Sequence, residues 1–287
     1  MAFLLAGCGA GTGSGGSSSP DPGLPSAGQS AGTSADSQDM PLLEDVSGSG
    51  QGNTSKGGLE DGSGGGISQP EILEHNDPYF DEALFIGDSI MEGIRQYVAA
   101  QRKETATLGE AKFLTSVAGI TLADLTGEND QCLLYSYRGE EAPLEELVAD
   151  IAPRRIFLLL GLNDLSAVAP SVERTVEHYG GLIDSLEKLL PEGEVIVLTN
   201  PPKVASKWLP AYTANRNFDN ELIDEFVTAL IDLCEERDIP YVDIHSCLSN
   251  EDGALPDDFC RDGYLHLSNT GAQAAVDALY AFAADKG

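Results

Sequence analysis

The feature that most constrains the fold of this sequence is a repeated alternation of strand-like and helix-like segments after residue 77. Continuous apolar runs predict strands at 83–86, 111–117, 155–160, 194–198 and 240–244. Amphipathic patterns predict the main helices at 90–101, 145–151, 172–190, 217–237 and 270–284. Such alternation, with right-handed crossovers, predicts an α/β fold: a three-layer, doubly wound parallel sheet of the flavodoxin-like type.

The chain before this region has a different composition. Residues 9–76 are rich in Gly, Ser and Pro, contain scattered acids, and have almost no aromatic or β-branched side chains. A segment of this kind cannot bury enough apolar surface to offset its chain entropy. We therefore expect 9–76 to be a disordered acidic linker and 77–287 to form one folded domain, which is long enough for a buried core.

The first eight residues resemble the end of a targeting signal. Residues 5–8, Leu-Ala-Gly-Cys, resemble the cleavage box of a bacterial lipoprotein, which implies lipidation of Cys8. The apolar stretch before Cys8 is short and lacks a basic region, so the signal is incomplete as written. The expectation is an extracytoplasmic protein that meets the membrane only through a lipid anchor, since no other stretch is apolar enough to span a bilayer.

Charge excludes one class of partner. The chain has 47 acidic and 16 basic residues, a formal net charge of -31. This surface repels phosphate backbones, so nucleic-acid binding is not expected. It also disfavours strongly anionic substrates, unless a local pocket reverses the field.

Cysteines do not indicate a metal site. Apart from Cys8, the chain has Cys132, Cys234, Cys247 and Cys260, for which three disulfide pairings are possible. Disulfides and buried free thiols both remain open. None of the cysteines has metal-ligand spacing with a histidine, so we predict neither a metal nor another cofactor.

Four residues with complementary chemistry are predicted to meet at one edge of the sheet. Ser89 follows the first strand within Gly-Asp-Ser, Gly119 follows the second, Asn163 follows the third, and His266 precedes the last helix. Ligands bind at the carboxyl ends of parallel strands. The Gly-Asp-Ser turn alone would be explained by a capped helix. Together the four supply a nucleophile, a base and oxyanion donors, which a simple cap does not need.

These blocks, in this order, resemble those of the SGNH, or GDSL, hydrolase superfamily: Gly-Asp-Ser, an isolated glycine, Gly-Leu-Asn-Asp, and an Asp before a His. The resemblance implies that Ser89 is the nucleophile and His266 the general base. It also implies that the oxyanion is bound by the Ser89 and Gly119 N–H groups and the Asn163 amide, and that Asp262 orients His266.

The sequence departs from that pattern at Asp262, because three residues instead of two separate it from His266. A bulge that absorbs the extra residue, replacement of Asp262 by Asp258, and a Ser-His dyad all remain open. Trp208 and Tyr212 occupy a loop at the same edge. They are candidates both for packing and for sugar or acyl contacts.

The first functional hypothesis is a serine esterase with an acyl-serine intermediate that removes short acyl groups, such as acetyl, from polysaccharide or peptidoglycan. The alternatives are a non-catalytic glycan-binding or scaffolding lipoprotein and an acyltransferase that uses the same residues. A phosphate-binding turn is disfavoured, because neither the glycine spacing nor the lysine of such loops is present.

Overall fold

A computed structural model describes residues 77–116, 119–126 and 134–286 of the 287-residue chain. Its centre is a parallel five-stranded sheet with the strand order β2-β1-β5-β6-β7. Counted among these strands alone, the order is 2-1-3-4-5, which is that of flavodoxin-like folds. The predicted fold class is therefore confirmed. The lipobox Cys8 and the predicted linker lie outside the described residues.

The elements occur in this order along the chain: η1 (Asp77–Phe80), β1 (Ala83–Gly87), α1 (Ser89–Gln101), β2 (Lys112–Thr115), α2 (Leu122–Leu125), β3 (Leu134–Tyr137), β4 (Glu140–Pro143), α3 (Leu144–Ile151), β5 (Arg155–Leu159), α4 (Leu162–Ser166), α5 (Val172–Glu187), β6 (Glu194–Leu198), α6 (Asn220–Glu236), β7 (Tyr241–Val242), α7 (Ile244–Leu248), η2 (Asp257–Phe259) and α8 (Asn269–Ala284).

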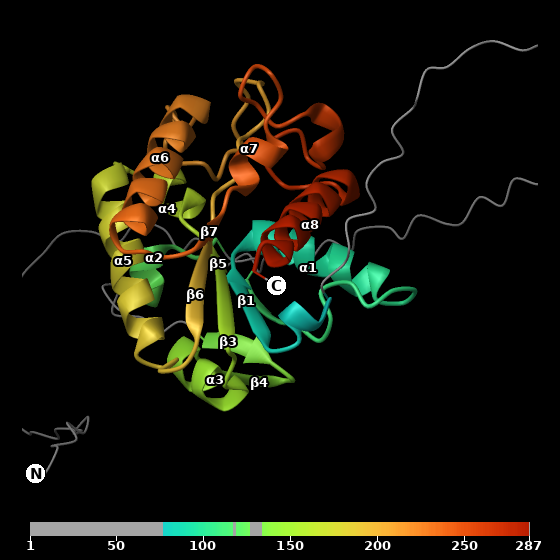
Figure 1. The fold of residues 1–287 in the computed structure, drawn as a ribbon. Helices are drawn as coiled ribbons and strands as arrows, with labels where there is room; N and C mark the ends of the chain where they lie inside the picture. The colour runs from blue at the N-terminus through green and yellow to red at the C-terminus, as the bar shows by residue number, and fades with distance from the viewer. Residues whose placement is uncertain (1–76, 117–118, 127–133, 287) are drawn as a thin grey trace, which may run out of the picture. The chain divides into compact units, whose positions relative to one another are not determined.

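Helices cover both faces of the sheet, as Figure 1 shows. Helices α1 and α8 pack together on one side, and α5 and α6 pack together on the other. None of the helices in the described ranges is long and apolar enough to cross a membrane. The longer helices place their apolar residues against the sheet and their polar residues on the opposite side.

The core is tightly packed around β1 up to the turn that precedes Ser89. Phe85 on β1 stacks on Phe157 of β5, with ring centroids 4.5 Å apart, and on Phe113 of β2, at 4.9 Å. At the end of β1, a Cβ on Gly87 would lie 2.4 Å from Cβ of Met91 and 2.8 Å from the carbonyl oxygen of Leu159. Only glycine permits this close approach of α1 to the sheet.

Two features of the fold were not expected from the sequence. Between β2 and β5 in the sequence, β3 and β4 form an antiparallel hairpin that is separate from the main sheet. The short helices α2, α4 and α7 are the second feature. Gly119 lies in the loop before α2, and Asn163 is the second residue of α4. The remaining strands and the five longer helices lie within a few residues of their predicted positions, and 194–198 matches β6 at both ends.

Candidate active site

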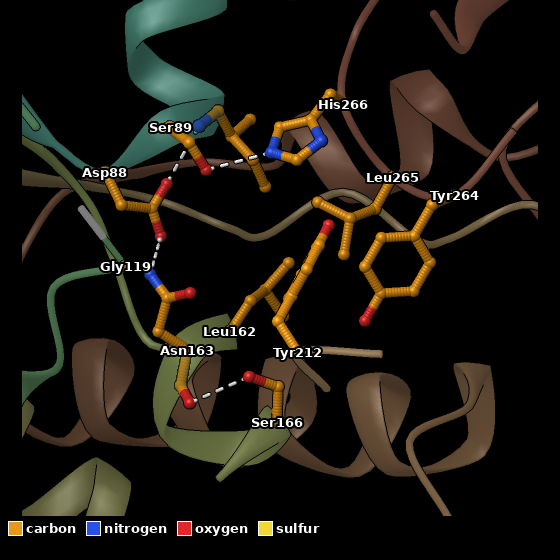
Figure 2. Close-up of a pocket in the computed structure, with 11 residues that line it drawn as sticks. Asp88, Ser89, Gly119, Leu162, Asn163, Ser166, Tyr212, Tyr264, Leu265 and His266 are labelled. Atoms are coloured by element: carbon orange, nitrogen blue, oxygen red, sulfur yellow. Dashed lines mark hydrogen bonds between the residues drawn. The ribbon is translucent and has the colours of Figure 1, made fainter. Parts of the chain in front are cut away.

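A cavity of about 570 Å³ lies at the carboxyl ends of the central strands. Its lining comes from the loops and helix starts that follow β1, β2 and β5, from the long loop after β6, and from the segment before α8. These residues are Asp88, Ser89, Ile90, Gly119, Leu162, Asn163, Ser166, Tyr212, Tyr264, Leu265 and His266. In Figure 2 the serine and the histidine face one another within this lining.

Ser89 is the first residue of α1. Asp88 is the N-cap: its carboxylate oxygen Oδ1 accepts the backbone N–H of Ile90 at 2.9 Å. The first N–H groups of a helix have no partner inside the helix, and the positive end of the helix dipole lies beside them. Ser89 thus has its hydroxyl and its backbone N–H at a position that favours developing negative charge.

His266 connects the serine to an acid. Oγ of Ser89 lies 3.0 Å from Nε2 of His266, and Oδ2 of Asp262 lies 2.5 Å from Nδ1 of the same ring. An ionised carboxylate only accepts hydrogen bonds, so Nδ1 carries a hydrogen and donates it in a hydrogen bond to Asp262. In the neutral ring, Nε2 is then free to accept the proton of the Ser89 hydroxyl.

The segment that carries Asp262 and His266 is a small closed hairpin. Cys260 and Leu267 form an isolated antiparallel bridge, and the N–H of Arg261 donates to the carbonyl of His266 at 2.8 Å. Between these residues Gly263 has a φ of 69°, a left-handed conformation that glycine adopts without strain. This turn accommodates the additional residue between the aspartate and the histidine.

Asp262 also organises the turn itself. Its Oδ1 accepts the backbone N–H groups of Tyr264, Leu265 and His266, at 2.9, 3.2 and 3.3 Å. Burial acts to raise the pKa of the Asp262 carboxyl, but the hydrogen bonds from His266 and Tyr264 outweigh it, and the pKa is lowered. One carboxylate therefore holds both the backbone turn and the imidazole. For Asp258, by contrast, the contact is through the main chain: its carbonyl accepts the Ser268 hydroxyl.

The Asn163 amide is also next to the serine, but it is engaged. Nδ2 of Asn163 donates to Oδ2 of Asp88 at 3.1 Å and to the carbonyl of Ile120 at 2.9 Å. An amide has two hydrogens, so both are in use in this structure. Donation to an oxyanion would require Asn163 to exchange one of these partners.

Two carboxyl groups at or near the site have raised pKa values. Asp88 is 2 % exposed, and desolvation raises its pKa to about 6, against the hydrogen bond from Ile90. Desolvation likewise raises the pKa of Asp164 to about 6. Both carboxylate oxygens of Asp164 accept the N–H of Leu122, at 3.1 and 3.0 Å, so this residue links α4 to α2.

The raised pKa of Asp164 predicts a measurable pH dependence of stability. A carboxyl whose pKa is higher in the folded than in the unfolded state favours folding fully at low pH, and this contribution is lost as the pH rises from about 4 through about 6. Asp164→Asn should flatten the decline of the unfolding free energy in that window by at most about 3 kcal/mol. Urea titrations at half-unit pH steps would measure this, with exposed Asp150→Asn as the control. An equal effect of both substitutions would contradict the prediction.

Other predicted residues are distributed around the cavity. Gly119 lines it with a φ of 66°, and Tyr212 lines it with 71 % of its surface exposed. Trp208 is not part of the lining; it packs edge-to-face on Tyr264, with ring centroids 6.2 Å apart. Cys234, Cys247 and Cys260 are free thiols, whereas Cys132 lies outside the described residues.

Several lining residues were not singled out from the sequence. Tyr264 and Leu265 adjoin His266, and Ile90 adjoins Ser89, so adjacency to a predicted site residue was the available signal. Ser166 and Leu162 come from α4, which the apolar pattern did not predict. In the described ranges, no group of three or more His, Cys, Asp or Glu side chains is arranged to hold a metal ion.

Comparisons with known proteins add a family and a fold. The model of the GDSL-like lipase/acylhydrolase family matches residues 85–274. Solved structures with the same fold include two from Bacteroides species. A GDSL-like lipase from Bacteroides thetaiotaomicron is 17 % identical, with a TM-score of 0.52, over 70 % of this chain and 88 % of that chain. A candidate acylhydrolase from Bacteroides fragilis is 19 % identical, with a TM-score of 0.52, over 69 % of this chain and 83 % of that chain. No significant match was found among curated proteins.

Proposed function

Because this chain belongs to the GDSL-like lipase/acylhydrolase family and is an ester hydrolase, we propose that it works through an acyl intermediate on Ser89. The observation that carries this proposal is the continuous contact from Ser89 Oγ through the His266 ring to the Asp262 carboxylate. A nucleophile, a base and a group that orients the base are the parts that serine acyl transfer requires.

The reaction proceeds in two halves. Ser89 Oγ attacks the ester carbonyl carbon while Nε2 of His266 takes the hydroxyl proton, and the imidazolium is stabilised by Asp262. Collapse of the tetrahedral adduct breaks the bond to the alcohol oxygen, which receives the proton from His266. Water then attacks the acyl-serine with His266 again as the base, so the acid is released and the Ser89 hydroxyl is restored.

The oxyanion is bound, in this proposal, by the backbone N–H groups of Ser89 and Gly119 and by the Asn163 amide. The first two are supported by the position of Ser89 at a helix start and of Gly119 in the cavity lining. For Asn163, attack creates a full negative charge beside an amide that otherwise donates to a neutral carbonyl at Ile120. A charged acceptor forms the stronger hydrogen bond, which favours the exchange.

The substrate we propose is a short acyl ester, such as acetyl, on an extracellular glycan, either polysaccharide or peptidoglycan. The support is the open cavity with Tyr212 at its rim, because aromatic side chains provide apolar contact surface with a polar end. The Leu-Ala-Gly-Cys sequence at residues 5–8 supports an extracytoplasmic protein tethered by a lipid on Cys8. Residues 9–76 would then serve as the tether between lipid and domain.

Active-site labelling tests the nucleophile directly. A fluorophosphonate probe should label the wild-type protein covalently and fail to label Ser89→Ala. Ser166→Ala is a matched control, since Ser166 lines the same cavity but its hydroxyl donates to the Asn163 carbonyl instead of a histidine. Equal labelling of wild type and Ser89→Ala would refute the assignment.

Asn163→Ala tests the third oxyanion donor. The loss of one such donor is expected to lower kcat by about 10²–10³-fold with little change in KM, because the bond to the oxyanion exists only in the transition state. Steady-state kinetics with p-nitrophenyl acetate would measure both constants. An increase confined to KM would show that Asn163 contributes to binding instead.

A further inference from the structure

A second cavity, of about 370 Å³, lies along the loop that connects β6 to α6. Three basic residues line it: Lys203, Lys207 and Arg216. The chain has only 16 basic residues against 47 acidic ones, so three at one cavity reverse the local charge of a strongly acidic protein. The acidic member of the lining, Asp219, is occupied as the N-cap of α6, where it accepts the N–H of Leu222.

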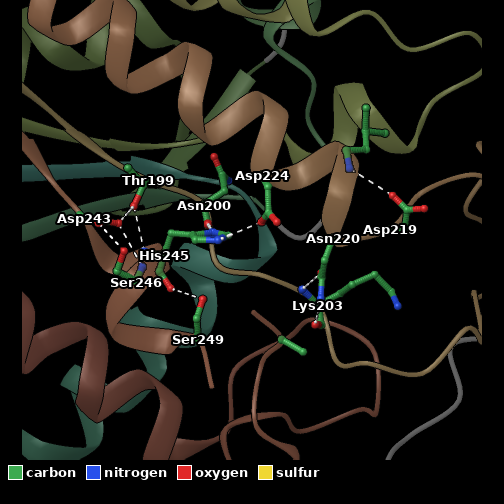
Figure 3. Close-up of polar contacts among 12 residues, drawn as sticks. Thr199, Asn200, Lys203, Asp219, Asn220, Asp224, Asp243, His245, Ser246 and Ser249 are labelled. Carbon is green, nitrogen blue, oxygen red and sulfur yellow. Dashed lines mark hydrogen bonds and ion pairs between the residues drawn. The ribbon is translucent and has the colours of Figure 1, made fainter. Parts of the chain in front are cut away.

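The start of this loop is held in place on two sides. Lys203 and Asn220 form reciprocal bonds: the N–H of Lys203 donates to Oδ1 of Asn220 at 2.8 Å, and Nδ2 of Asn220 donates to the Lys203 carbonyl at 2.9 Å. Nearby, Nδ1 of His245 contacts the carbonyl of Asn200 at 2.7 Å, and its Nε2 lies 3.2 Å from Asp224 (Figure 3). The cavity therefore sits on a preorganised part of the chain.

The three bases are not equivalent. The Lys203 ammonium is turned into the protein and donates to the carbonyls of Val204 and Ser206, so it stabilises the loop. Lys207 and Arg216 are exposed, and neither forms an ion pair within the described part of the chain; the guanidinium of Arg216 reaches only the carbonyl of Pro210, at 3.5 Å. These two cations have their charge available for a ligand.

The same loop reaches the catalytic cavity. Tyr212 lines that cavity, and Trp208, 56 % exposed, lies between Lys207 and Tyr212 in the sequence. Both aromatic rings pack edge-to-face against Tyr264, which precedes His266 by two residues and also lines the catalytic cavity. One continuous segment thus carries two cations, two exposed aromatic rings and part of the catalytic wall.

We propose that the Lys207/Arg216 cavity is a subsite for an anionic group, a carboxylate or a phosphate, of the polymer whose ester is cleaved at Ser89. This inference rests on the proposed function, since it extends the glycan substrate to an acidic one. Trp208 and Tyr212 would contact sugar rings between the two cavities. The charges of Lys207 and Arg216, which have no ion-pair partner in the described residues of a chain with net charge -31, favour binding of an anionic group over a neutral sugar.

Binding measurements in the Ser89→Ala background separate recognition from turnover. The test variant is Lys207→Gln/Arg216→Gln; Lys203 is kept because it holds the loop. The control variant, Arg174→Gln/Lys188→Gln, removes the same charge from exposed positions around α5. The ligands are polygalacturonate for carboxylate, poly(glycerol phosphate) for phosphate, and neutral xylan.

We expect Ser89→Ala to bind one of the two anionic polymers more tightly than xylan, and the test variant to raise that Kd about tenfold. The control variant and the affinity for xylan should be unchanged. Equal weakening by test and control variants, or preference for xylan, would overturn the subsite. Failure of the proposed function would appear elsewhere, as no Ser89-dependent hydrolysis of p-nitrophenyl acetate.

Discussion

His266→Ala is expected to lower kcat for p-nitrophenyl acetate by about 10⁵–10⁶-fold, the scale of losing a serine hydrolase's base. The reason is geometric: Nε2 of His266 lies 3.0 Å from Ser89 Oγ, within direct reach of its proton. In the described residues, no other histidine lines the catalytic cavity to substitute for it. Stopped assays at high enzyme concentration would quantify the residual rate.

The double variant Ser89→Ala/His266→Ala provides a sharper check. Because nucleophile and base act as one unit, the double variant should lose no more activity than either single variant. Losses that multiply would show that the two residues act independently. Circular dichroism and thermal unfolding serve as the folding control, since both side chains lie at the cavity surface and not in the core.

Asp262→Asn is expected to lower kcat by about 10⁴-fold. If the asparagine keeps its oxygen toward the N–H groups of Tyr264 to His266, its amide faces Nδ1 of the ring. A donor at that position stabilises the tautomer that carries the proton on Nε2. This Nε2 cannot accept the proton of the Ser89 hydroxyl. The loss arises from the wrong tautomer and not from a missing side chain.

The matched control is Asp258→Asn, which removes the other acid considered from the sequence. Asp258 uses its main-chain carbonyl, so kcat should change less than about twofold, as is usual for a surface substitution. A large loss in Asp258→Asn with little in Asp262→Asn would reverse the assignment of the orienting acid. Near-wild-type kcat in both variants would instead support a Ser-His dyad.

The sequence was most informative where burial imposes a clear pattern. Strand β5 is a continuous apolar run because both of its faces are covered. The end of that run marks the edge of the sheet, which is why the position of Asn163 at this edge could be predicted. The hairpin of β3 and β4 lacked such a pattern. Its turn residues Arg138 and Gly139 both have positive φ, and Glu140–Pro143 has few residues that favour strands.

Contacts between residues distant in the sequence were harder to predict than the positions of strands and helices. Asp88 accepts a hydrogen bond from Asn163, 75 residues away, and this contact depends on the pairing of β1 with β5, which places the residues that follow the two strands side by side. The spacing between Asp262 and His266 was similarly ambiguous. A left-handed Gly263 and three backbone N–H donors to one carboxylate oxygen make four-residue spacing compatible with contact.

Asp262 and His266 lie together in one closed hairpin, so the proposed base and its orienting acid form a single local unit of the fold. Its two ends are fixed together by the Cys260–Leu267 bridge and by the bond from the Ser268 N–H to the Phe259 carbonyl, at 2.7 Å. Because the ends are fixed, we expect a residue gained or lost inside the hairpin to change its loop without displacing α8 or the sheet. The length of this loop is therefore a position where the site can be varied by design while Asp262 stays in contact with His266.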